Sequence, residues 1–187
     1  MMDLVPRLRH IMFDPLAYLH PSRLSRTINL SAARQRSALN GIFLDALPNA
    51  MPATPEADSV YAHWVRYWHR LPHIALALGA QQLRQHLAQG GTWLCLPEQA
   101  QAFAAYKLRE AREGEKTSLV SVAQIQACGL SALLAWREWV PEALVARLPL
   151  LFPEKIVELQ GAQPIPSADL LIFKLAIQND QNYSHPR

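Results

Sequence analysis

The chain has 187 residues, of which half are hydrophobic and 18% are charged, so it can bury a core and is not disordered throughout. Its formal net charge of +3 is mildly basic and comes without any long run of like charges, which excludes a basic nucleic-acid-binding arm. Seven glycines stand against fourteen prolines, and the prolines separate apolar segments, a pattern that predicts many short helices with sharp ends.

The cysteines and the apolar segments indicate the compartment. Cys95 and Cys128 have no metal-ligand spacing and lie among apolar residues, so we interpret them as buried thiols in a reducing compartment. Charged residues and a proline interrupt Met1–Phe13, so it contains no apolar signal core. The most apolar stretches, Ile74–Ala80 and Leu130–Trp136, are far shorter than the roughly 20 residues of a membrane span. We therefore expect a soluble cytoplasmic protein without direct membrane insertion.

The N-terminal part predicts two helices. Asp14-Pro15 is typical of a helix start, with an N-cap followed by proline, and Pro21 ends that helix early. A second helix is predicted from Ser31 to Pro48, with apolar residues at three-to-four spacing. The proline-containing segment Asn49–Pro55 predicts a loop. It divides the chain into an N-terminal helical segment, 1–50, and a main helical core, 51–187, although both can also form one domain.

The main core predicts further short helices. Thr54-Pro55-Glu56 and Pro97-Glu98 are helix starts, and Gly129 is expected to cap the end of a helix over Leu119–Ala127. The helix that starts at Thr54 has its apolar stripe from Val60 to Trp68 and is broken by Pro72. The other predicted elements are helices over Ile74–Leu87, Leu130–Val140 and Pro141–Leu148, a short strand at Lys155–Leu159, and a last helix capped by Ser167. The predicted class is an all-α compact bundle of short helices with proline-rich connections, with room for one short strand pair.

The densest group of candidate site residues lies between Tyr61 and His73. His69 and His73 have a metal-ligand interval, but Pro72 interrupts the helix that would align them, and His63 falls on another face, so we predict no metal site. Trp64 and Trp68, four residues apart, are typical either of core packing or of a protein–protein hot spot.

Motifs for catalysis and cofactor binding are missing from the sequence. It contains no Gly-x-Ser-x-Gly elbow, no activated cysteine and no glycine-rich phosphate loop, and its acidic residues occur singly. We therefore predict no catalytic residues, no cofactor and no enzyme. The alternative function is a small helical regulator that binds nucleic acid through the basic stretch Arg23–Arg36. That stretch lacks interleaved aromatic residues, so a solvated helix face explains it better.

One short motif resembles the N-terminal signature of a known family. Phe13-Asp14-Pro15-Leu16-Ala17-Tyr18-Leu19-His20-Pro21-Ser22-Arg23-Leu24 is similar to that of the SctK (YscK, OrgA, MxiK) accessory proteins of bacterial type III secretion systems. Three later segments agree in order: Ala75–Arg84, Gly129–Leu150, and Phe173-Lys174-Leu175 with Tyr183-Ser184-His185. These are packing motifs rather than catalytic ones, and Asn49–Glu56 and Arg109–Lys116 match nothing in that family.

The resemblance implies an adaptor of the cytoplasmic sorting platform, peripheral to the inner membrane at the base of the secretion apparatus. Its implied partners are the cytoplasmic domain of the inner-membrane ring protein (SctD-like) and the C-ring or spoke protein (SctQ-like), with no nucleic acid. The expected ring-facing residues are Asp14, Tyr18, His20 and Arg23, and Trp64 and Trp68 are further candidates for partner binding. For the polar members of the signature, a local capping role is the alternative.

Overall fold

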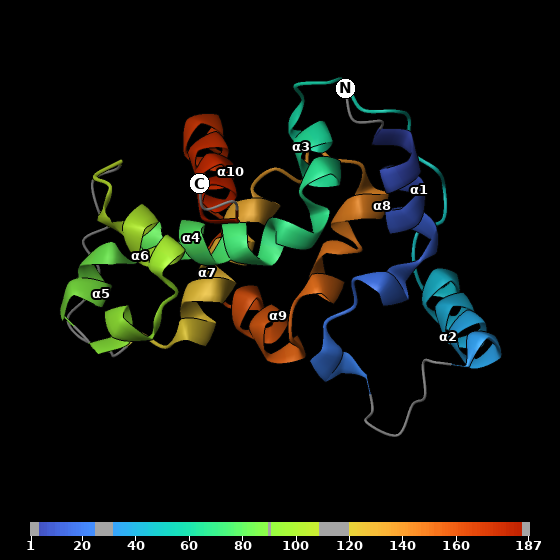
Figure 1. Ribbon diagram of the computed structural model, residues 1–187, viewed down its shortest axis with the longest axis horizontal. Coiled ribbons are helices and arrows are strands. Elements are labelled where there is room, and N and C mark those ends of the chain that lie inside the picture. Colours follow the sequence, from blue (N-terminus) through green and yellow to red (C-terminus); the bar gives the residue numbers. More distant parts are fainter. Residues whose placement is uncertain (1–3, 25–31, 90, 109–119, 185–187) are drawn as a thin grey trace. The chain divides into compact units, whose positions relative to one another are not determined.

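The computed structural model of the chain describes residues 4–24, 32–89, 91–108 and 120–184. Within these residues every regular element is helical, which confirms the predicted all-α class (Figure 1). Contacts divide the chain into two compact units, Met1–His69 with Trp136–Glu154 and Arg70–Ala135 with Lys155–Arg187. The first unit contains residues on both sides of position 50, and the division into segments 1–50 and 51–187 stays a prediction.

The first unit is built from short helices around buried aromatic and aliphatic side chains. Its elements are α1 (Leu4–Phe13), η1 (Pro15–Ala17), η2 (Pro21–Arg23), α2 (Ala33–Asp45), α3 (Val60–Arg66), α8 (Glu142–Val145) and η5 (Leu148–Leu151), while η3 (Trp68–Arg70) lies at its boundary. Helix α1 packs against α3 and α8 and buries Leu4, Leu8, Ile11 and Met12. This spacing of four, three and one residues places the apolar side chains on one helix face.

The second unit is organised by two helices that approach closely. Its elements are α4 (Leu71–Gln82), α5 (Arg84–Gln89), η4 (Gly91–Cys95), α6 (Glu98–Ala105), α7 (Val122–Leu134) and α10 (Leu170–Ser184), and α9 (Glu154–Gly161) begins at its boundary. Helix α4 contacts α7, α6 and α10 (Figure 1). It buries nine of its twelve residues, so it is apolar on nearly all sides, as a central helix must be.

Two glycines allow the backbones of α4 and α7 to meet. A Cβ atom on Gly79 would overlap the carbonyl oxygen of Ile125, and one on Gly129 would overlap that of Ala75. The predicted role of Gly129 as a helix end is therefore wrong, since α7 continues to Leu134. Glycine stands there because the neighbouring helix leaves no room for a side chain.

Four other predicted features are also corrected. Lys155–Leu159 lies inside helix α9, because Glu154 follows Pro153 as an acidic first-turn residue and Ile156 turns inward. Helix α3 begins at Val60, where Ser59 accepts a hydrogen bond from the Ala62 N–H, rather than at Thr54. The last helix is capped by Asp169, whose carboxylate accepts from the Ile172 N–H. Cys95 is exposed and Cys128 is only partly buried, so the prediction of two buried thiols is wrong.

Candidate functional site

The signature segment Asp14–Arg23 follows α1 directly and holds the first unit together through backbone carbonyls. The last carbonyls of α1 lack partners within the helix, as those of any helix do. Three side chains supply donors to them: Tyr18 Oη donates to Ile11 O at 2.9 Å, Arg147 Nη2 to Met12 O at 3.1 Å, and Asn40 Nδ2 to Phe13 O at 2.6 Å. The end of α1 is therefore closed by residues from three different parts of the chain.

The same segment also binds η5. The backbone N–H of His20 donates to Leu150 O at 2.8 Å. Arg23 Nε donates to Phe152 O at 2.7 Å, and its Nη2 donates to Pro149 O at 3.1 Å. Each of these hydrogen bonds joins residues more than 120 positions apart. The Arg23 guanidinium therefore forms internal hydrogen bonds, although the residue is partly exposed to solvent.

Asp14 and His20 are, like Arg23, partly exposed polar members of the signature. Asp14 forms an ion pair with Arg36 at 2.8 Å and makes no side-chain cap, so its predicted capping of the next helix is wrong. His20 lies 2.8 Å through Nδ1 from Ser22 Oγ and accepts from the Ser22 N–H, which caps η2. Partial burial and the nearby Arg23 lower the pKa of His20, because both disfavour the imidazolium.

The three aromatic candidates for partner binding lie in the core. Trp64 is 0% exposed, Trp68 1% and Tyr18 6%. The Tyr18 ring meets the Trp68 ring edge-on at 5.4 Å, and the two indole rings are 6.4 Å apart. A direct partner contact through these side chains would require them to leave this cluster, so their burial favours a packing role. Burial also raises the pKa of Tyr18, since the phenolate would be poorly solvated there.

Arg147 is the residue of this region that sequence reasoning missed. It is 0% exposed and donates to the carbonyls of Pro48, Ala143 and Met12 at 2.7, 2.8 and 3.1 Å. Burial lowers its pKa and the neighbouring Tyr18 opposes that effect. A single arginine inside the apolar stretch Leu144–Phe152 was the available signal, because an isolated charge in such a stretch is buried only when it has dedicated partners.

The basic stretch and the histidines do not converge on a ligand site in the described residues. Arg23 and Arg36 are engaged internally, Arg34 is exposed, and Arg26 lies outside the described residues. His63 Nδ1 lies 2.9 Å from Ser59 O, and His73 lies 3.9 Å from Asp180. In the described ranges no three His, Cys, Asp or Glu side chains are grouped as metal ligands.

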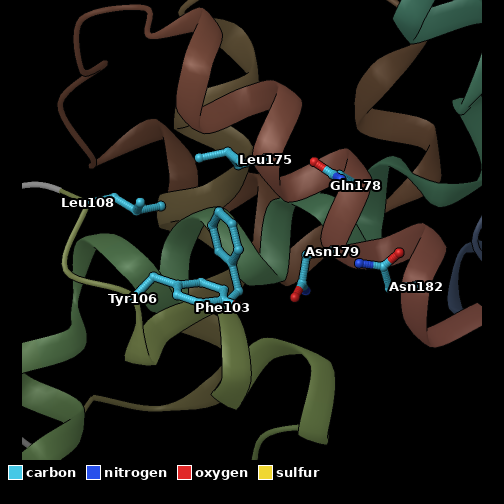
Figure 2. A pocket seen from close by; sticks show the side chains of 7 residues that line it. All are labelled: Phe103, Tyr106, Leu108, Leu175, Gln178, Asn179 and Asn182. Atoms are coloured by element: carbon cyan, nitrogen blue, oxygen red, sulfur yellow. The ribbon is translucent and has the colours of Figure 1, made fainter.

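A cavity of about 260 Å³ lies in the second unit between α6 and α10 (Figure 2). Phe103, Tyr106 and Leu108 line it from α6 and the segment after it, and Leu175, Gln178, Asn179 and Asn182 line it from α10. The lining combines carboxamides with aromatic rings and has no ionised group, which suits hydrogen bonding and packing rather than acid–base chemistry. Asn179 is already engaged, since its Nδ2 donates to Gln99 O at 3.0 Å.

The chain is an all-helical protein. Its signature residues, Trp64, Trp68 and Arg147 pack in the first unit or form internal hydrogen bonds there. Of the helices in the described ranges, none combines the length and the apolar character needed to cross a membrane. The model of the family described as "Bacterial type III secretion apparatus protein (OrgA_MxiK)" matches residues 8–182. The chain belongs to this OrgA/MxiK family of type III secretion apparatus proteins.

Individual relatives agree with the family match. The chain is 36% identical over 182 residues to the oxygen-regulated invasion protein OrgA of Salmonella typhimurium, in strains 14028s, SL1344 and LT2, covering 94% of this chain and 87% of OrgA. It is 26% identical over 128 residues to the uncharacterized protein YgeO of Escherichia coli K12, covering 67% of this chain and 89% of YgeO. No solved structure matches the chain.

Proposed function

We propose that this chain is a non-enzymatic adaptor of the type III secretion sorting platform. It links the cytoplasmic domain of the inner-membrane ring protein to the C-ring or spoke protein, and it works at the cytoplasmic side of the inner membrane. The observation that carries the proposal is the family match over residues 8–182, which makes the chain a component of an apparatus built from proteins.

The signature segment divides into two kinds of residue under this proposal. Asp14 and His20 keep part of their surface exposed and are the candidates for touching the ring protein. Tyr18, Trp64 and Trp68 support that surface from beneath, and Arg23 fixes it to η5 through the carbonyls of Pro149 and Phe152. A rigid support lowers the conformational cost of binding, which is how buried residues contribute to an interface.

Size-exclusion co-purification tests the proposal. The full chain is mixed at micromolar concentration with the cytoplasmic domain of the ring protein, and separately with the spoke protein. Co-elution with each partner supports an adaptor, and failure to co-elute with both at low salt overturns it. His20→Ala probes the contact because, among the described residues, its ring bonds to neighbouring Ser22, and His86→Ala on α5 is the matched control. Tyr18→Ala is unsuited to this purpose because it removes a core side chain.

A further inference from the structure

Helix α2 of the first unit is attached to the rest of the chain along one side. On that side Arg36 forms an ion pair with Asp14. Asn40 bonds to the Phe13 carbonyl and the Leu16 N–H. None of the thirteen residues of α2 is buried, so its opposite side faces solvent. We name this opposite side the α2 outer face, and it consists of Arg34, Ala38, Gly41, Ile42 and Asp45.

The centre of the α2 outer face is apolar and open. Ile42 is 65% exposed, Ala38 is exposed, and a Cβ atom added to Gly41 would meet nothing within 4 Å. A charged residue stands at each end of the face, Arg34 near the start of the helix and Asp45 at its last position. Neither of the two forms an ion pair with another described residue. The face therefore presents apolar surface between two opposite charges that a partner can reach.

Both charges stand at the end of α2 where the helix dipole disfavours them. Arg34 lies in a first turn without an acidic residue, and Asp45 lies in a last turn without a basic one. Since the N-terminal end of a helix is partially positive and the C-terminal end partially negative, each side chain is repelled by its own helix end. An antiparallel neighbouring helix reverses this situation, because it brings its C-terminal end to Arg34 and its N-terminal end to Asp45.

The spacing along the α2 outer face makes it complementary to itself. Arg34 and Asp45 are separated by about three helical turns, so they lie on one side of the helix about 16 Å apart. Ala38 follows Arg34 by four residues, and Gly41 precedes Asp45 by four. When a second copy of α2 lies antiparallel with its Asp45 beside Arg34, its Arg34 lies beside Asp45 and its Gly41 beside Ala38. One two-fold axis through the centre of the pair satisfies all of these contacts.

We propose that the α2 outer face binds the same face of a second copy of this chain, as an antiparallel helix pair with two-fold symmetry. Ile42 of each copy packs over Ala38 of the other, and the lack of a side chain at Gly41 lets the two helices approach closely. Two pairs between Arg34 and Asp45 fix the direction and the register of the helices. The inference goes beyond the proposed function and involves no other protein.

The size of the face decides the strength of the pair. Exposed ion pairs add little affinity by themselves, so the apolar contact of Ile42 supplies most of the binding and the charges select the antiparallel arrangement. One helix pair covers less than the roughly 800 Å² per partner of a standard interface. We therefore expect a weak, reversible dimer with a Kd on the order of 0.1 mM.

Sedimentation velocity of the full chain over a range from about 10 µM to about 1 mM tests the inference. The average mass should rise with concentration from 21.0 kDa towards twice that value, and less steeply at high salt. Arg34→Glu sets two acids against each other and Asp45→Arg sets two cations, so each should weaken association at least about tenfold. Arg9→Glu, at an exposed position of α1, is the matched control and should associate like the parent chain.

The two charge reversals also separate association from folding. Each of them replaces a charge that the dipole of α2 disfavours by one that it favours, so circular dichroism should show unchanged or higher helicity. An equimolar mixture of the Arg34→Glu and Asp45→Arg variants should regain the dimer of the parent chain, because each copy then supplies the charge that the other lacks. A chain that carries both reversals should associate like the parent.

Three outcomes would overturn the inference. The first is a parent chain that stays monomeric up to about 1 mM. The second is association that neither charge reversal weakens, which would place the contact on another surface. The third is a mixture of the two reversed variants that stays monomeric. Ile42→Ser gives a further check, because loss of this exposed side chain should weaken the dimer while leaving the folded monomer intact.

Discussion

Arg147 and Met12, 135 positions apart, are joined by a hydrogen bond of 3.1 Å from the guanidinium to the backbone carbonyl. The same side chain also binds the carbonyls of Pro48 and Ala143, so one arginine connects α1, the loop after α2 and α8. Arg147→Met keeps the length of the stem but leaves these carbonyls without a donor. We expect the free energy of unfolding to fall by about 2–4 kcal/mol in urea titrations.

Arg137→Met is the control for that substitution, because Arg137 is exposed. It should stay within about 0.5 kcal/mol of the parent chain. If Arg147→Met proved as stable as Arg137→Met, the three hydrogen bonds of the Arg147 guanidinium would not stabilise the folded chain as proposed.

Two helical glycines, Gly129 in the second unit and Gly41 in the first, give predictions of opposite sign. Gly129→Ala places a methyl group against the Ala75 carbonyl and should destabilise the chain by about 1–3 kcal/mol or more, because α4 and α7 must separate. Gly41→Ala on α2 meets nothing within 4 Å and should stabilise by up to about 1 kcal/mol, since alanine favours helix. Thermal melts of the two variants should therefore move in opposite directions, and a shared direction would contradict the close approach of the helices.

The sequence correctly predicted helices whose starts are marked by residues adjacent in the chain. Pro97-Glu98 and Pro141-Glu142 correctly mark the starts of α6 and α8, since a proline followed by an acidic first turn stabilises a helix start without any tertiary contact. Helix α1 was not predicted, although the spacing of Leu4, Leu8, Ile11 and Met12 was available in the sequence. In Met1–Phe13 charged residues and a proline interrupt this apolar period.

The remaining errors concern residues whose role is set by distant partners. Asp14 precedes a proline and looks like a cap, but Arg36 binds its carboxylate. Gly129 looks like a helix end, but the backbone of α4 requires it. For the candidate site, the sequence located the signature and its polar residues, whereas the burial of Tyr18, Trp64 and Trp68 depends on packing that no local pattern reports.

Helix α2 should open first among the described helices of the first unit. None of its residues is buried, and it is held by the Asp14–Arg36 ion pair and by Asn40, whose carboxamide bonds Phe13 O and the Leu16 N–H. Asn40→Ala removes both carboxamide contacts. We expect hydrogen exchange of the α2 amides to speed up by about ten- to thirtyfold while exchange in α4 is unchanged, because such contacts contribute about 1 kcal/mol each.

Ser37→Ala, on an exposed face of the same helix, is the control for Asn40→Ala and should leave the exchange rates of α2 as they are. Uniform acceleration across α2 and α4 in Asn40→Ala would mean that the helix opens only when the whole chain unfolds. Slow exchange of α2 in the parent chain would likewise contradict its weak attachment.

Stability should fall on mild acidification because of His69. Its pKa is lower in the folded chain than in the unfolded chain, owing to burial and to the charges of His10 and Arg7. As pH falls below the ordinary value of 6.5, the unfolded state takes up a proton first, so folding loses free energy until pH passes the lowered pKa. Above about pH 7.5 both states are neutral at this residue and the effect is absent. Chemical unfolding between about pH 7.5 and pH 5 should show this loss, and His69→Gln should make it smaller, leaving the part that comes from the lowered pKa of His20. A parent chain as stable at pH 5.5 as at pH 7.5 would show that His69 is protonated without cost in the folded state.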